Sequence, residues 1–352
     1  MQNIVNIQYK QTGKSVNVNE TGMRPMAARA YEYRDAQYLL IKAPPASGKS
    51  RALMFIALDK LKNQGLKKVI VAVPERSIGS SFAKTDLIEQ NNFFANWLPK
   101  DELNLCTPGS DGSKSKVQAF HNFMKNSDEQ ILICTHATLR FACEELDEKI
   151  FDKTLLAIDE FHHVSADAEN RLGDLLREIM RKSSAHVVAM TGSFFRGDSV
   201  PILLPEDEEK FTKVTYNYYE QLNGYEYLKS LGIGYHFYQG KYTNAIMEIL
   251  NTDQKTILHI PNVNSGESTK DKHNEVDFIL DAIGDVIKQD KETGVIHVKR
   301  HNDGKVLKVA DLVEDNQRER DKIVNYLRKI ESVDDMDLII ALGMAKEGFD
   351  WP

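Results

Sequence analysis

Short apolar runs recur along the first half of the chain, separated by polar or amphipathic segments. The run KKVIVAVP at residues 67–74 is apolar at nearly every position, which is typical of a strand buried on both faces of a sheet. The same pattern predicts strands at residues 38–41, 130–139, 153–164 and 186–195. Residues 51–62 instead place apolar side chains at helical spacing. This alternation predicts an α/β fold with a mostly parallel sheet.

The second half of the chain repeats this design. The pattern there predicts a strand at residues 255–261, a helix at 273–289, a hairpin turning at Asn302-Asp303-Gly304, a helix at 318–329 and a strand at 336–342. We therefore expect a second sheet that is also parallel. The expected divisions are an N-terminal hairpin or extension at residues 1–22, a first domain at 23–212 and a second domain at 213–352, with a linker near 215–235.

Composition narrows the class of protein. The chain has 352 residues, of which 41% are apolar and 28% charged, as in average globular proteins. It has neither a run of about 18 apolar residues nor a basic N-terminus followed by an apolar segment, so we expect no membrane span, no signal peptide and a cytoplasmic location. The three cysteines form no C-x-x-C pair, which argues against a zinc site. A net charge of −7 argues against broad electrostatic binding to nucleic acid.

A candidate phosphate-binding loop follows the first predicted strand. The sequence APPASGKS matches G-x-x-x-x-G-K-[ST] except at its first position, and it consists of Ala43, Pro44, Pro45, Ala46, Ser47, Gly48, Lys49 and Ser50. In such a loop, backbone N–H groups and the lysine bind phosphate oxygens, and the final hydroxyl binds Mg²⁺. The alternative is an ordinary strand-to-helix turn with an exposed lysine. A second GKS at residues 13–15 lacks the first glycine and a following helix, so we do not expect it to bind phosphate.

Two adjacent acids, Asp159 and Glu160, end another predicted strand. Ligands of open α/β sheets gather at the carboxyl ends of strands, and neighbouring carboxylates there are costly unless a cation or solvent meets them. Asp159 would hold Mg²⁺ through water, and Glu160 would orient or deprotonate the attacking water. The alternative is a helix start at which the helix dipole favours acids. The adjacent His162 and His163 point to different faces, so we do not expect them to share a metal.

Taken together, these motifs resemble those of a superfamily 2 helicase of the DEAD/DEAH-box type, and the chain looks most like the motor subunits of restriction enzymes. APPASGKS is similar to motif I, and VAVPERS at residues 71–77 to motif Ia. DEFH at 159–162 is similar to the D-E-x-H box, and TGS at 191–193 to motif III. ALGMAKEGFDWP at 341–352 is similar to motif V.

The resemblance implies two RecA-like domains with ATP between them and nucleic acid crossing both. In that family Gly348 would approach the γ-phosphate and Asp350 the ribose or the hydrolysis machinery. The residues that would couple the nucleotide state to the second domain are Thr191, Ser193 and His162. The residues that would contact the nucleic-acid backbone are Pro74, Arg76, Thr135 and Thr138. The cofactors implied are ATP and Mg²⁺.

The sequence also departs from the family pattern. Met26 and Ala27 follow Arg24-Pro25 where the family often has a glutamine that contacts adenine, and Leu342 replaces a frequent threonine of motif V. Ala46 stands where many members have glycine, at a position suited to unusual backbone angles. Motif VI and its arginine finger would lie beyond Pro352, so we expect an incomplete second domain and a weak or absent ATPase.

Three functions are open at this point. The leading one is a nucleic-acid-stimulated ATPase that translocates on or remodels DNA, with RNA less favoured and a nuclease or methyltransferase as a potential partner. The second is a nucleotide-binding switch or scaffold without motor activity. The third, a metabolic kinase, gives no role to the D-E-x-H box or motif V. The tyrosine-rich segment 213–242 suits either base stacking or half-buried strands, and its alternation favours strands.

Overall fold

The computed structural model describes residues 5–10, 18–106, 113–163, 171–192, 205–224 and 230–342. It divides the chain into two compact units. One is Gln8–Leu231, and the other is Gly232–Pro352 together with Met1–Ile7.

The first unit is built on a six-stranded sheet with the order β4-β3-β5-β6-β2-β7. Its strands are β2 (Tyr38–Lys42), β3 (Lys68–Val73), β4 (Ile131–Thr135), β5 (Thr154–Ile158), β6 (His186–Thr191) and β7 (Thr212–Thr215). Every pairing in this sheet is parallel. The α/β fold with a parallel sheet is therefore confirmed for this unit, and the carboxyl ends of its strands share one edge.

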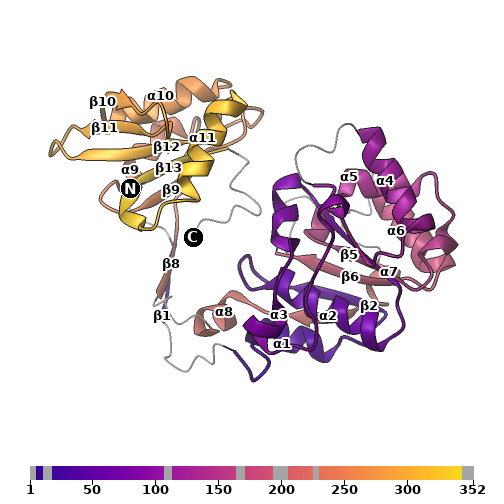
Figure 1. Cartoon of the computed structure of the whole chain (residues 1–352). Helices are drawn as coiled ribbons and strands as arrows, with labels where there is room; N and C mark the ends of the chain where they lie inside the picture. The colour runs from indigo at the N-terminus through magenta and orange to yellow at the C-terminus, as the bar shows by residue number, and fades with distance from the viewer. Residues whose placement is uncertain are drawn as a thin grey trace. The chain divides into compact units, whose positions relative to one another are not determined.

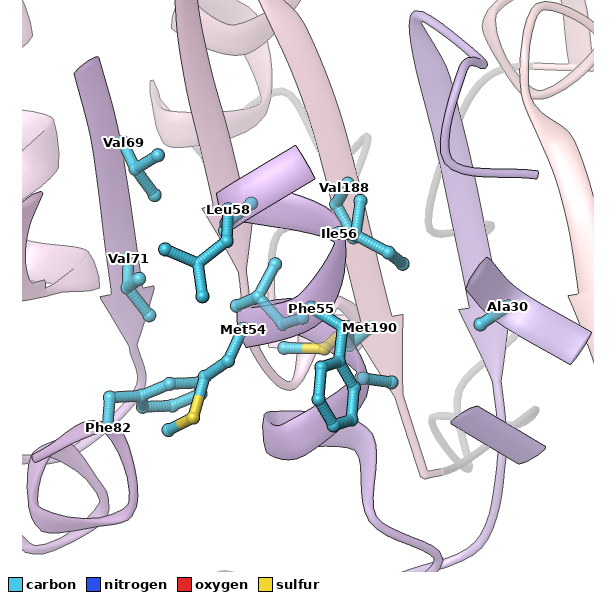
Figure 2. Packing of buried hydrophobic residues seen from close by; sticks show 14 of the residues in the cluster. Ala30, Met54, Phe55, Ile56, Leu58, Val69, Val71, Phe82, Val188 and Met190 are labelled. Carbon is cyan, nitrogen blue, oxygen red and sulfur yellow. The ribbon is translucent and has the colours of Figure 1, made fainter. Parts of the chain in front are cut away.

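Helices cover both faces of this sheet (Figure 1). On one face α1 (Pro25–Glu32) and α2 (Lys49–Asn63) pack against alternate residues of the strands. Figure 2 shows Leu58 of α2 between Val71 of β3 and Val188 of β6. The other face is covered by α4 (Ser113–Asn126), α5 (His136–Cys143) and α6 (Arg171–Lys182). Each fully buried aliphatic or aromatic side chain contributes about 1.5–3 kcal/mol, so this double covering fixes the sheet firmly.

Three predicted strands are shorter in the structure than in the prediction. The strand predicted at residues 130–139 ends at Thr135, because the Thr135 hydroxyl accepts a hydrogen bond from the Thr138 N–H and begins helix α5. The strand predicted at 153–164 ends at Ile158 and leads through Asp159 into a single 3₁₀ turn, Phe161–His163. Of the strand predicted at 186–195, the described part ends at Thr191. In the first two, a local turn ends the strand where polar residues follow the apolar run.

The second unit has a five-stranded sheet with the order β10-β11-β12-β13-β9. Its strands are β9 (Thr256–His259), β10 (Gly284–Gln289), β11 (Ile296–Arg300), β12 (Val306–Asp311) and β13 (Leu338–Ala341). The β12-β13-β9 pairings are parallel, but β10-β11-β12 are antiparallel. The expectation of a parallel second sheet is thus only half right. Helices α9 (Thr243–Ile249) and α10 (Lys272–Ile283) pack on one face, and α11 (Gln317–Leu327) packs on the other.

Strand β10 is the clearest departure in this unit. The predicted helix 273–289 ends at Ile283, and residues 284–289 pair with β11 instead. Gly284 makes the close approach possible, since a Cβ there would lie 2.2 Å from the Lys299 carbonyl oxygen. The hairpin predicted at Asn302-Asp303-Gly304 does join β11 and β12, and Gly304 has the positive φ of 72° that such turns favour.

The division between the two units falls between Leu231 and Gly232, inside the linker expected near 215–235 and not at the boundary expected between residues 212 and 213. Strand β7 pairs with β2 in the first sheet, and α8 (Tyr218–Gly224) follows it within the same unit. At the N-terminus, β1 (Val5–Lys10) pairs with β8 (Ser230–Tyr235) in a two-stranded sheet, so its partner is not the neighbouring segment that the predicted hairpin required. Both pairings join residues far apart in sequence.

The remaining elements are short. They are the helices α3 (Leu87–Asn91) and α7 (Pro205–Glu208) and the 3₁₀ turns Arg76–Phe82, Asp101–Leu103, Glu148–Phe151, Phe161–His163 and Val333–Asp335. Among the helices that the structure describes, none has the length and apolar composition that crossing a membrane requires.

Candidate nucleotide-binding site

The phosphate loop joins the end of β2 to the start of α2 at the carboxyl edge of the six-stranded sheet. Gly48 caps the helix with a φ of 94°, and Ala46 has a φ of 58°. The left-handed region costs a residue with a Cβ roughly 1–2 kcal/mol, so Ala46 is held in place by its surroundings. The loop therefore has the unusual backbone that the sequence suggested at position 46, with alanine in place of glycine.

Lys49 is turned into this loop. Its side chain is 8% exposed, and its Nζ donates hydrogen bonds to the carbonyl oxygens of Ala43 (3.0 Å) and Pro44 (3.1 Å). Burial lowers the pKa of Lys49, while the carboxylates of Glu160 and Asp159 oppose that shift. Ser47 is also buried, and among the described residues its hydroxyl oxygen has no hydrogen-bond partner. The loop thus offers a buried cation, an unsatisfied hydroxyl and a helix start, which together suit a phosphate group.

Asp159 lies at the end of β5, two strands away from β2 in the sheet. It is 5% exposed, and its backbone N–H donates to the Ala72 carbonyl (2.9 Å). The Asp159 carboxylate accepts a hydrogen bond from the Glu160 N–H (3.0 Å). The backbone carbonyl oxygen of Asp159 lies 2.9 Å from Nε2 of His136. Glu160 has a φ of 46°, a left-handed conformation that is uncommon for a residue with a side chain.

Glu160 reaches toward the end of β6. Its carboxylate accepts a hydrogen bond from the Gly192 N–H (3.3 Å) and lies 3.4 Å from Nδ1 of His162. The same His162 nitrogen is 3.1 Å from the Thr191 hydroxyl. A Cβ built on Gly192 would lie 3.5 Å from Lys49 Nζ. The structure therefore brings the loop, the D-E-x-H box and the described part of TGS together around Lys49.

The arrangement has no metal site made of protein ligands alone. In the part of the chain that the structure describes, no three His, Cys, Asp or Glu side chains gather closely enough to hold an ion. Ser50 follows Lys49 in the first turn of α2, and Asp159 directly follows β5. A hard cation such as Mg²⁺ commonly keeps several waters and shares substrate phosphates, so a sparse set of protein ligands fits it.

The predicted nucleic-acid residues follow the neighbouring strands β3 and β4. Pro74 comes directly after β3, and Arg76 begins the turn Arg76–Phe82. Thr135 and Thr138 form the first turn of α5, with their hydroxyl oxygens 3.0 Å apart. Arg76 lies close enough to Lys116 to lower the pKa of that lysine, although burial is the larger cause. These residues place cations and hydroxyls on the same edge of the sheet as the phosphate loop.

Two supports of the phosphate loop were not found from the sequence. The side-chain amide of Gln221 on α8 donates to the Pro45 carbonyl (2.9 Å), and Arg24 donates to the Ala46 carbonyl (3.4 Å). Helix α8 is anchored in turn by an ion pair of 2.6 Å between Arg29 and Glu220. Gln221 was missed because the expected boundary put residues after 212 in the second domain. Gly348, Asp350 and Ser193 lie outside the described residues.

Comparison with known proteins finds one matching family model. The model for the DEAD/DEAH box helicase matches residues 25–197. Over all 352 residues the chain is 70% identical to a protein of Bacillus subtilis (strain 168) named "Putative ATP-dependent helicase YeeB". The chain spans 58% of the length of that relative.

Solved structures with a similar fold are more distant. The chain is 13% identical to the Mycobacterium smegmatis helicase Lhr, solved with ssDNA and AMP-PNP, over 93% of this chain and 40% of that one, with a TM-score of 0.46. It is 17% identical to the Type ISP restriction-modification enzyme LlaGI, solved with a DNA substrate mimic, over 56% of this chain and 20% of that one, with a TM-score of 0.36. Neither likeness is close enough to carry an argument about this chain.

Proposed function

We propose that the chain is the ATP-hydrolysing motor of a nucleic-acid helicase or translocase, because the family model for the DEAD/DEAH box helicase matches residues 25–197. The observation that supports this most is the gathering of Lys49, Glu160 and Gly192 at one edge of the sheet. Three strands deliver these residues, and a purely structural role would not require their convergence.

Each residue of the site has a proposed role in the reaction. Backbone N–H groups of the loop and Lys49 bind the β- and γ-phosphates, so the lysine exchanges its two carbonyl partners for phosphate oxygens. Ser50 and, through water, Asp159 hold the Mg²⁺ that accompanies ATP. Glu160 orients and deprotonates the attacking water, and its bonds to Gly192 and His162 set the direction of its carboxylate. Thr191 and His162 pass the state of the nucleotide onward.

Nucleic acid is the proposed second substrate. Pro74, Arg76, Thr135 and Thr138 would receive its backbone, where hydroxyls, helix N–H groups and cations suit phosphates. We propose DNA ahead of RNA because the motifs look most like those of restriction-enzyme motors, which also motivates a nuclease or methyltransferase as partner. A net charge of −7 is consistent with such a local contact in place of a broad basic surface.

The test is the steady-state rate of phosphate release from Mg-ATP by the full-length protein, alone and with single- or double-stranded DNA or RNA. We expect stimulation by at least one nucleic acid in the wild type and loss of turnover in Lys49→Ala. Lys62→Ala, an exposed lysine of the same helix, is the matched control and keeps the wild-type rate. Nucleotide binding without turnover in the wild type would favour the alternative, a nucleotide-binding switch or scaffold.

A further inference from the structure

The peptide group that joins Asp159 to Glu160 is held at both ends. Its carbonyl oxygen lies 2.9 Å from Nε2 of His136, and its N–H donates to the Asp159 carboxylate at 3.0 Å. Since a carbonyl oxygen only accepts, Nε2 of His136 carries the proton and donates. Hydrogen bonds to the carbonyl oxygen and from the N–H thus fix the orientation of this peptide plane. The bond to the carbonyl oxygen comes from His136, which follows a different strand.

This peptide plane sets the backbone of Glu160. Rotation of the plane changes the φ of Glu160, which is 46°. A residue with a Cβ keeps such a left-handed conformation only where its surroundings enforce it. In this conformation the Glu160 carboxylate reaches the Gly192 N–H at 3.3 Å. Release of the peptide group would let Glu160 relax toward ordinary angles and would move its carboxylate away from β6.

His136 is the first residue of α5 and lies between Thr135 and Thr138. The Thr135 hydroxyl accepts from the Thr138 N–H at 3.2 Å, and the two hydroxyl oxygens are 3.0 Å apart. A phosphate arriving at this helix start would compete for the same N–H and hydroxyl groups. Any shift of this first turn carries the His136 ring with it, and the hydrogen bond to Asp159 transmits the shift.

From this geometry we infer that His136 is a positioning residue that couples nucleic acid at the start of α5 to the orientation of Glu160. In this role it acts through the Asp159–Glu160 peptide group. The inference rests on the proposed function, because it assigns a residue to the stimulation that function requires. It predicts that the hydrogen-bond donor of His136 matters for stimulation and not for nucleotide binding.

His121 provides a matched control on the neighbouring helix α4. Its Nε2 lies 3.1 Å from the Ala142 carbonyl oxygen, so it also joins a histidine ring to a backbone carbonyl of the same layer. It is more buried than His136, with 8% exposure, and it contacts the far end of α5. A purely structural loss of such a bond on that side of the sheet is therefore reproduced by His121→Met, whereas the Asp159–Glu160 peptide group is left intact.

The experiment compares His136→Met, which has no donor, with His136→Gln, whose amide can replace Nε2 as donor. The kcat and the KM for ATP are measured with and without the stimulating nucleic acid, and thermal midpoints are recorded for every variant. We expect the stimulated kcat of His136→Met to be about five- to tenfold lower than that of the wild type, which is the effect of losing one directed hydrogen bond. The KM for ATP should stay within about twofold of wild type. His136→Gln should recover most of that loss, and His121→Met should keep the full stimulation.

The outcomes separate this inference from the proposed function. A wild type that no nucleic acid stimulates overturns both. A stimulated wild type with His136→Met stimulated equally, or with His136→Gln as impaired as His136→Met, overturns the role of His136 and leaves the proposed function standing. Should His136→Met not fold, His136→Glu takes its place, because an acid at a helix start is stabilising and a carboxylate cannot donate to the carbonyl.

Discussion

Helix α2 buries one lysine at each end, and the two ends lie at opposite edges of the six-stranded sheet. Lys60, at the amino edge, is fully buried, and its Nζ lies 2.9 Å from the Ala36 carbonyl oxygen and 2.9 Å from Nδ1 of His186. Among the described residues, the hydrogen bonds of Lys49, at the carboxyl edge, go to carbonyls of its own loop. Protein groups satisfy the hydrogen bonds of Lys60, whereas beside Lys49 the Ser47 hydroxyl has no hydrogen-bond partner among the described residues.

This difference shows how a lysine in a binding site can be distinguished from a buried lysine with a structural role. Burial alone does not distinguish the two lysines, because burial lowers the pKa of both. Positive φ is more frequent at the carboxyl edge, where Ala46, Gly48 and Glu160 have it, than at the amino edge, where Gly65 and Lys153 do. Strain of this kind combined with unsatisfied polar groups is expected where a ligand completes the structure. Substitutions at the two edges should therefore have different effects on ATP binding, turnover and stability.

Removal of the carboxylate at the carboxyl edge should have the largest effect. Glu160→Gln keeps the size of the side chain but not the base, so we expect turnover of ATP to fall about 10²- to 10⁴-fold. The affinity for ATP should change little, because Lys49 and the loop remain. Single-turnover hydrolysis and equilibrium titration with a fluorescent ATP analogue measure the two quantities, and a variant with unchanged turnover would remove Glu160 from the reaction.

Removal of the lysine at the amino edge should affect stability only. Lys60→Met leaves the Ala36 carbonyl and His186 without their donor, and we expect unfolding free energy to fall by about 1–3 kcal/mol. ATP affinity should stay at the wild-type value. Urea unfolding followed by circular dichroism gives the first quantity, and loss of ATP binding in a folded Lys60→Met protein would break the distinction between the edges.

The amino edge should also show a dependence on pH. Burial, and then the Lys60 ammonium, lower the pKa of His186 from 6.5 to about 4. The unfolded chain therefore binds more protons than the folded one between these values, so stability falls as pH drops from about 6.5 to about 4. Asp35 and Asp59 lie near Lys60 and favour its charged form. Urea midpoints across this range should slope less in His186→Asn, which cannot titrate, and an equal slope would contradict the assignment.

The smallest effect is expected from the strained alanine of the loop. Ala46→Gly relieves the left-handed strain but adds freedom to the unfolded chain, so we expect a net change within about 1 kcal/mol and not a loss. Ala28→Gly, within helix α1, is the contrasting control and should cost about 1 kcal/mol. Equal destabilisation of both variants in urea would mean that Ala46 is not strained.

The sequence was informative where structure is decided locally. The apolar runs around β3 and β5 identified buried parallel strands, and Gly48-Lys49-Ser50 identified the loop that leads into α2. The sequence was uninformative where distant residues decide. At Gly284 the chain passes from helix α10 to strand β10, where the close approach of the Lys299 carbonyl requires glycine. Strand β7 joins the first sheet by pairing with β2 at its edge. The peptide group before the left-handed Glu160 contacts His136, which begins helix α5, so no local pattern could have revealed this contact.

The most direct test of a nucleotide site at the carboxyl edge of the sheet uses the two lysines of α2 together. ATP is titrated in the presence of Mg²⁺ against wild type, Lys49→Met and Lys60→Met, with folding of each variant verified beforehand. We predict that Lys60→Met binds ATP as the wild type does and that Lys49→Met binds at least about tenfold more weakly, as the loss of one charged phosphate contact implies. Equal affinities for Lys49→Met and wild type would contradict a nucleotide site at the carboxyl edge of the sheet.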